Sequence, residues 1–221
     1  MRSVFDIDGP VMSVVIRIFD CICLSVLWLV FSLPILTVGA SSTALYVTVH
    51  RYLRRGEGHP LRTFLDAFRD NFKRSTLVWL AALCVLDLLT ADILVLRTMV
   101  LNRHPLGRLY WLALILGGVA VTWTAYCFAY AARFQGRARD VLRSSLFLTL
   151  AHPVRALGVF LILFAAALAV MTGPGLIAII PTAVCWLESA VMENVFLLHM
   201  RPEDAERETH NHQAKEHHCE E

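Results

Sequence analysis

The sequence predicts an all-α, polytopic membrane protein with about five transmembrane helices and two or three amphipathic helices on the cytoplasmic side. Two observations predict this class. Of the 221 residues, 57% are hydrophobic and 17% are charged, whereas a soluble domain is about 45–50% apolar and about 25% charged. The apolar residues also gather in blocks that approach the roughly 20 residues a transmembrane helix needs.

Five segments are predicted to cross the bilayer. In chain order they are about 18–36, 76–96, 109–132, 156–172 and 174–200. The last two share an apolar stretch of 45 residues, which as one helix would be about 67 Å long, about twice the thickness of a bilayer core. Gly173-Pro174-Gly175 interrupts that stretch, so it is predicted to be a hairpin of two helices.

Residues 1–200 are thus predicted to form one integral membrane domain. Residues 201–221 differ in composition, because they are acidic, contain four histidines and Cys219, and lack large apolar side chains. Such a composition is typical of a solvated, disordered tail. Its histidines and Cys219 are donor types that bind zinc or nickel, but no apolar residues are there to fold around a metal. No metal site and no cofactor are therefore predicted.

Basic residues predict the orientation. The loops after the first four crossing segments hold seven, three, five and no Lys or Arg residues. Because cytoplasmic loops are enriched in these residues, the alternation places the N-terminus outside and the C-terminus in the cytoplasm. The lipid bilayer is then the first expected partner. The net charge of +2 does not suggest nucleic acid as another.

Two cytoplasmic connections are predicted to be amphipathic helices. In residues 61–74 the apolar side chains recur at helical spacing. The rest of this segment carries basic residues, namely Arg62, Arg69, Lys73 and Arg74. A helix of this design rests in the membrane interface, with its cations near lipid phosphates. Residues 138–150 repeat the pattern.

The stretch LPILTVGASSTAL, residues 33–45, is predicted to be a joint at membrane depth. Pro34 lies at the end of the first crossing segment, and Gly39 allows either a close backbone approach or a chain reversal. A serine, Ser41 or its neighbour, is expected to cap a new helix. That helix, about 42–55, is predicted to be amphipathic. The sequence leaves open whether it lies in the interface or inside the membrane.

Two carboxylates lie deep in predicted crossing segments. Asp87 falls near the bilayer midplane and Glu188 in the cytoplasmic half. A charge at such depth costs at least about 2.5–3.5 kcal/mol, so acids there usually face a protein interior or a water-filled cavity. Asp87 and Glu188 are therefore candidates for an intramembrane ion or proton site if they face one another. The alternative is a neutral acid, hydrogen-bonded to a backbone or hydroxyl group, with a packing role.

Three stretches resemble one known family. They are SLPILTVGASSTALY (32–46), TFLDAFRDNFKRSTLVWL (63–80) and SLFLTLAHPVRAL (145–157). All three are similar to blocks of the YesL family, small bacterial multi-pass membrane proteins defined by a domain of unknown function. The likeness runs roughly from residue 14 to residue 200. Ser25 departs from the pattern, because the family commonly has asparagine at that position.

The resemblance implies a protein of the bacterial cytoplasmic membrane. Family members often accompany carbohydrate-uptake genes, which implies an accessory or scaffold subunit, with a sugar ABC transporter permease or a second copy of the chain as partner. The residues leave two alternatives open: a small oligomeric transporter or channel that uses the buried carboxylates, and a membrane enzyme or lipid-binding protein. The sequence has no P-loop, GxSxG, HExxH or dinucleotide-binding glycine motif, so an enzyme is not expected.

Overall fold

The fold is helical throughout the part of the chain that the computed structural model describes, which is residues 10–54, 59–134 and 136–199, and no strand occurs there. The seven α-helices in these ranges are α1 (Pro10–Ser32), α2 (Val38–Thr48), α3 (Pro60–Leu101), α4 (Leu109–Arg133), α5 (Ala138–Ala151), α6 (Pro153–Thr172) and α7 (Ile180–His199). Short 3₁₀ segments occur at Ile35–Thr37, Pro105–Arg108 and Pro174–Ala178, and a π-helical segment, Val49–Arg54, continues α2. The predicted tail at 201–221 lies outside the described residues.

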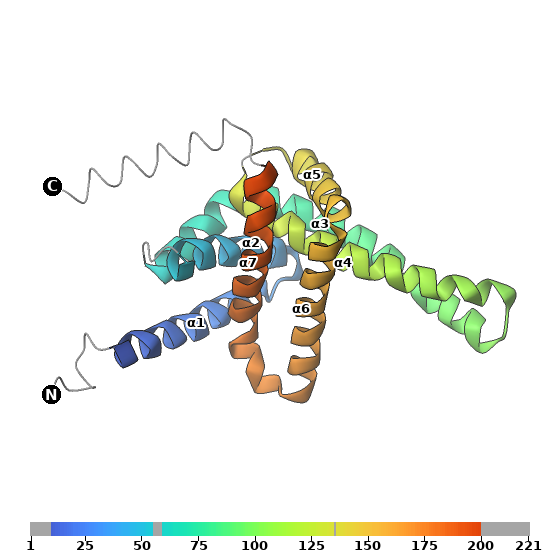
Figure 1. Ribbon diagram of the computed structural model, residues 1–221, viewed down its shortest axis with the longest axis horizontal. Coiled ribbons are helices and arrows are strands. Elements are labelled where there is room, and N and C mark those ends of the chain that lie inside the picture. The colour runs from blue at the N-terminus through green and yellow to red at the C-terminus, as the bar shows by residue number, and fades with distance from the viewer. Residues whose placement is uncertain (1–9, 55–58, 135, 200–221) are drawn as a thin grey trace.

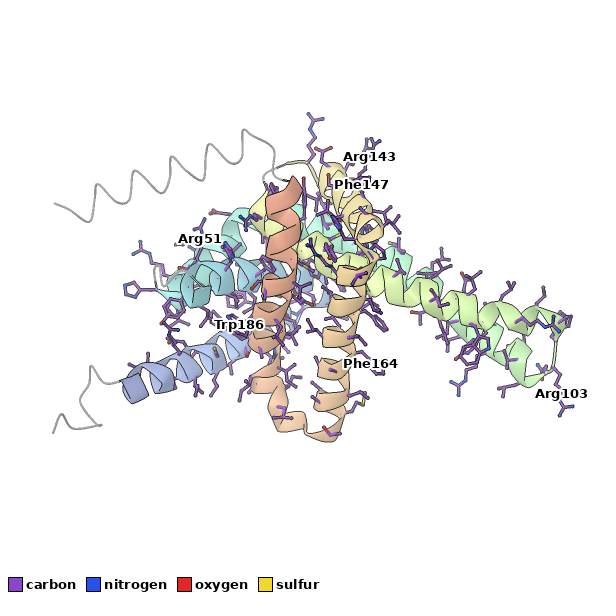
Figure 2. The ribbon with its side chains drawn as sticks, in the orientation of Figure 1. Arg51, Arg103, Arg143, Phe147, Phe164 and Trp186 are labelled. Carbon is purple, nitrogen blue, oxygen red and sulfur yellow. The ribbon has the colours of Figure 1, made fainter. Side chains whose placement is uncertain are left out.

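Helix pairs leave a shared centre in different directions (Figure 1). Helices α1 and α2 extend to one side, the distal parts of α3 and α4 extend to the opposite side, and α6 and α7 form a third pair. Helix α5 packs mainly on α4. Large apolar side chains such as Phe147, Phe164 and Trp186 are exposed on the outside of this assembly (Figure 2). An apolar exterior is what a protein surrounded by lipid requires.

Three helical segments are long and apolar enough to cross a membrane: Pro60–Leu101, Pro105–Arg133 and Pro153–Thr172. They contain the predicted crossing segments 76–96, 109–132 and 156–172. The apolar part of α7, Ile180–Met192, is shorter. The sequence of the chain and its structure therefore agree on a helical protein with at least three candidate crossing helices.

Helix α3 differs from its prediction, which separated an amphipathic helix at 61–74 from a crossing helix at 76–96. The structure has one continuous helix of 42 residues, about 63 Å long and about twice as long as a bilayer core is thick. The reason is that no glycine or proline lies between Pro60 and Leu101 to interrupt the backbone hydrogen bonds. The first part of α3 buries Phe64 and Ala67 inside the protein, so part of its apolar surface packs on other helices, while Leu61, Leu65 and Phe72 are exposed.

Helix α2 also differs from its prediction as an amphipathic helix. It is buried on all sides, because α1, α3, α4 and α7 all pack against it. Its buried residues are mostly small: Gly39, Ala40, Ser41, Thr43, Ala44, Leu45, Tyr46 and Thr48. The threonine hydroxyls are satisfied within the helix, since Thr43 donates to the carbonyl of Gly39 and Thr48 to that of Ala44, both at 2.8 Å. Small residues with internally bonded hydroxyls let four neighbouring helices approach one backbone.

The joint between α1 and α2 is a tight turn that begins earlier than predicted. Helix α1 ends at Ser32, not at residue 36, and α2 begins at Val38 with Thr37 as its N-cap residue. Ser41 therefore lies inside the helix and does not cap it. Its hydroxyl instead contacts the Ser32 hydroxyl at 2.6 Å and so ties the two helices together.

Helices α1 and α2 are antiparallel along most of their length. Near the turn, Trp28 Nε1 donates a hydrogen bond to Ser42 Oγ at 3.1 Å. At the far end, the Tyr52 hydroxyl donates to the carboxylate of Asp20. The early part of α1 and the basic residues that follow α2 consequently lie at the same end of this hairpin.

Candidate functional site

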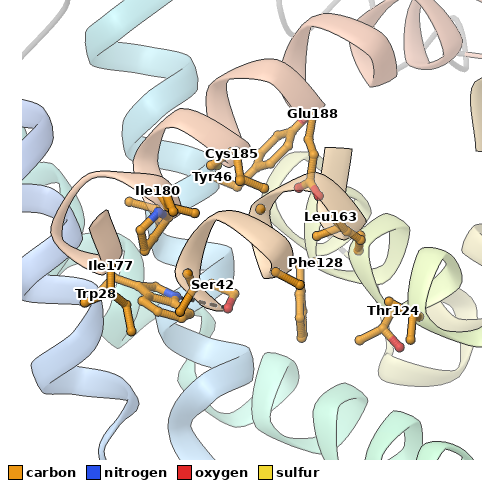
Figure 3. A pocket seen from close by; sticks show the side chains of 18 of the residues that line it. Trp28, Ser42, Tyr46, Thr124, Phe128, Leu163, Ile177, Ile180, Cys185 and Glu188 are labelled. Carbon is orange, nitrogen blue, oxygen red and sulfur yellow. Dashed lines mark hydrogen bonds between the residues drawn. The ribbon is translucent and has the colours of Figure 1, made fainter. Parts of the chain in front are cut away.

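A cavity of about 480 Å³ lies where the helix pairs meet, and it is the candidate functional site. Helices α1, α2, α3, α4, α6 and α7 all contribute residues to its wall (Figure 3). Most of the wall is aliphatic, with Leu45, Leu163 and Val184 as examples. Ligand sites in proteins are typically cavities of about 300–1,000 Å³ with apolar walls and a few polar groups, so this cavity has the size of a site for a small molecule.

Among the described residues that line the cavity, Glu188 is the only one with a charged side chain. It projects from α7 toward the interior of the cavity (Figure 3), and its residue is 9% exposed. One carboxylate oxygen, Oε1, is fully buried and has no hydrogen-bond partner among the described residues. A buried carboxylate without a partner is costly, so the arrangement requires a proton, water or a ligand at this oxygen.

Four aromatic side chains line the same cavity: Trp28, Tyr46, Trp79 and Phe128. They come from four different helices, α1 to α4. The two indoles are held by hydrogen bonds, from Trp28 Nε1 to Ser42 and from Trp79 Nε1 to the carbonyl of Ile35 at 2.7 Å. The rings of Trp79 and Phe128 also pack on each other, with centroids 5.8 Å apart. These contacts fix the rings of the cavity wall.

Two further polar groups, the Tyr126 hydroxyl on α4 and Arg155 on α6, lie outside the cavity lining. Tyr126 is completely buried, and neither its hydroxyl nor Arg155 Nη1 has a hydrogen-bond partner in the described part of the chain. Buried polar groups without a partner thus occur on α4, α6 and α7.

Asp87, the other candidate for an intramembrane ion site, is elsewhere. It lies on the exposed face of α3 and does not line the cavity, although its neighbour Leu86 does. The structure therefore does not bring Asp87 and Glu188 together on one site. The helical repeat explains the difference, because adjacent residues of a helix point about 100° apart. Among the described residues no cluster of three or more potential metal ligands occurs.

Residues 61–74, predicted to be a basic amphipathic helix, are helical as the first third of α3, and their four cations differ in exposure. Arg62, Arg69 and Lys73 are exposed. Arg74 is half-buried, and its guanidinium donates hydrogen bonds to the carbonyls of Ala131 and Phe134. These carbonyls belong to the C-terminal end of α4, where the helix leaves acceptors unpaired and carries partial negative charge. Arg74 thus caps the C-terminal end of α4.

The joint residues also take distinct places. Pro34 is exposed in the turn, with an extended backbone. Gly39 is buried against α3, and a side-chain carbon at this position would lie 2.6 Å from the carbonyl oxygen of Ser75 and closer still to the Cβ atom of Trp79. Of the two roles expected for Gly39, the structure shows the close backbone approach.

One contact between distant helices was not predicted from the sequence. Ser25 of α1 accepts a hydrogen bond from the backbone N–H of Thr182 at 3.3 Å, and the two hydroxyls are 2.7 Å apart. Thr182 is the third residue of α7, so its N–H has no acceptor within the helix. Ser25 therefore caps α7 from another helix. Ser25, which stands where the YesL family commonly has asparagine, was the signal that the sequence offered, but its partner Thr182 lies 157 residues away.

Comparison with known proteins covers part of the chain. No curated protein and no solved structure matches it. The matched segment begins within α1, includes all of α2 and ends within α3. It thus contains the whole of the buried small-residue helix and parts of the two helices that flank it in the sequence. Over residues 21–93 the chain matches the family described as "Protein of unknown function, DUF624".

Proposed function

We propose that the chain is an accessory subunit, without catalytic activity of its own, of a carbohydrate-uptake system in the bacterial cytoplasmic membrane. The link to carbohydrate uptake rests on the resemblance of three sequence stretches to the YesL family. A match to a family of unknown function is compatible with it. The proposal assigns no catalytic activity because the sequence carries no recognised catalytic motif.

The observation that carries the proposal is the exposure of the candidate crossing helices. Only 11% of the apolar window of α3 and 6% of that of α6 is buried within the chain. Helices that contact so little of their own chain leave most of their faces to lipid or to other membrane helices. Membrane helices associate through packing and small residues rather than through a hydrophobic driving force, so a partner subunit fits such faces.

In-cell photo-crosslinking tests this proposal. A photoreactive amino acid is placed at Leu88, Trp111 or Met171, which are 66%, 69% and 85% exposed, and at the fully buried Val78 as a control. We expect at least one exposed position, but not Val78, to form an adduct that mass spectrometry identifies as a transporter permease, in cells grown on several sugars. Adducts with lipid or with the chain itself at every exposed position would refute the accessory role.

The proposed membrane arrangement has five crossings, with α1 and α7 added to the three long helices, and a cytoplasmic C-terminus. The distribution of basic residues supports it and places the N-terminus outside. The α1–α2 hairpin favours a second arrangement. Tyr52 lies beside Asp20, so the start of the α1–α2 hairpin and the basic segment that follows the hairpin lie on the same side of the membrane. The enrichment of basic residues in cytoplasmic loops would place that side in the cytoplasm.

A small oligomeric transporter or channel is the second candidate function. The burial of Glu188 in a cavity between the helices favours it, since intramembrane acids commonly mark ion and substrate pathways. Flux through liposomes that contain the purified chain tests it. We expect Glu188→Gln to abolish such flux and Asp87→Asn, on the exposed face of α3, to leave it unchanged. Absence of flux from the wild-type chain would remove this candidate.

A further inference from the structure

The cavity combines a ring of aromatic side chains with one unpaired carboxylate. Trp28, Tyr46, Trp79 and Phe128 supply the rings, and Glu188 supplies the acid. We propose that this cavity is a binding site for a small organic cation, an amine or quaternary ammonium group attached to an apolar body. The site goes beyond the accessory role and does not depend on it.

The aromatic rings provide the first part of the recognition. The face of an aromatic ring carries partial negative charge, and a cation within about 6 Å of the ring centre is attracted to it. Aromatic cages of this kind are a common solution for binding ammonium groups. Here the rings come from four helices and two are fixed by hydrogen bonds. These two rings are therefore held in place before a ligand arrives, which reduces the entropic cost of binding.

The carboxylate provides the second part. No lysine or arginine is among the residues that line the cavity, so within the described structure no cation of the protein neutralises Glu188 there. Arg155 lies outside the cavity lining, and neither its Nη1 nor Glu188 Oε1 has a hydrogen-bond partner among the described residues. A cationic ligand would supply the missing opposite charge at a position where burial strengthens the attraction.

The volume limits the size of the ligand. A cavity of about 480 Å³ accommodates a cation with a phenyl ring or a short alkyl chain, and its largely aliphatic wall matches such a body. Sugars fit poorly, because their hydroxyl groups would find few polar partners in this wall. The proposed ligand therefore belongs to a different chemical class from a transported carbohydrate.

Binding of two molecules of equal size tests the proposal. The probes are 2-phenylethylamine, which is a cation at neutral pH, and 2-phenylethanol, which is neutral. The full-length protein in lipid nanodiscs is titrated with each, and tryptophan fluorescence reports binding because Trp28 and Trp79 line the cavity. We expect saturable binding of the amine, and binding of the alcohol that is weaker by at least about tenfold.

Matched variants locate the binding. Glu188→Gln keeps the size of the side chain and is expected to weaken amine binding at least about tenfold while leaving the alcohol within about twofold. Phe128→Leu removes one ring of the cage and should weaken amine binding by roughly threefold or more. Asp87→Asn, on the outer face of α3, should change neither.

A second substitution keeps the test decisive if the glutamate variant unfolds. Ala166→Phe fills the cavity from α6 and should abolish amine binding while leaving the thermal midpoint within a few degrees. The proposal is overturned if the wild-type protein shows no saturable binding of the amine, if amine and alcohol bind equally, or if amine binding survives in both Glu188→Gln and Ala166→Phe.

Discussion

Gly39→Ala should destabilise the protein, because Gly39 is the point of closest approach between α2 and α3. An added methyl carbon would lie 2.6 Å from the Ser75 carbonyl oxygen and closer to Trp79 Cβ. Neither atom is at the end of a flexible side chain, so relief requires a shift of a helix. Overpacking typically costs about 1–3 kcal/mol, and a clash with the backbone belongs at the upper end. Alanine regains about 1 kcal/mol through its helix propensity.

The net expectation is a loss of about 2 kcal/mol, which for a protein of this size lowers the thermal midpoint by about 4–8 °C. The matched control is Gly158→Ala in α6, where an added carbon meets nothing within 4 Å. This control should stabilise the protein by up to about 1 kcal/mol. Both variants are compared with the wild-type chain by thermal unfolding in the same detergent. Equal midpoints for Gly39→Ala and Gly158→Ala would refute the proposed close contact.

Three other predictions follow from the fold. In Arg74→Lys the charge is kept, but the ammonium group cannot reach both carbonyls at the end of α4, so the free energy of unfolding should fall by about 1–3 kcal/mol. Arg69→Lys, on the exposed face, is the control and should have no effect on thermal unfolding. The hydrogen bond to the Asp20 carboxylate raises the pKa of Tyr52 from 10.0 to about 12. The stability difference between wild-type protein and Tyr52→Phe should therefore be constant below pH 10 and shrink as the pH rises toward 12. A difference that persists above pH 12 would contradict this. Single cysteines at Ile16 and Arg51, in a chain whose native cysteines are replaced by serine, distinguish the two membrane arrangements when they are labelled with an impermeant maleimide. The proposed five-crossing arrangement predicts labelling from opposite sides of the membrane, and the arrangement that the α1–α2 hairpin favours predicts labelling from the same side.

Long apolar blocks and strong breakers made the class and several helix boundaries predictable. The break at Gly173-Pro174-Gly175 is an example, because α6 ends at Thr172 and α7 begins at Ile180. These features depend on local backbone chemistry, which the sequence states directly. Glu188 was identifiable for a similar reason, since an acid inside an apolar stretch needs a protein environment.

Features that depend on contacts between distant segments were not predictable in the same way. The residues of α2 are poor helix formers in isolation, and only the packing of four helices around it explains their use. Whether Asp87 shares a site with Glu188 depended on which face of α3 meets the protein, and the sequence does not show this. The aromatic cage has no sequence pattern, because its rings come from four helices and meet only in the folded chain.

The burial of α2 has a consequence for the biosynthesis of the protein. Helices that face lipid can be stable in the membrane as soon as they leave the translocon, whereas α2 carries serine and threonine residues and needs protein on every side. Two of the helices that enclose it, α4 and α7, are synthesised much later. The N-terminal third must therefore wait, incompletely packed, for the rest of the chain. Truncation after α3 should yield a product that cellular quality control removes, even though it contains the whole matched family segment.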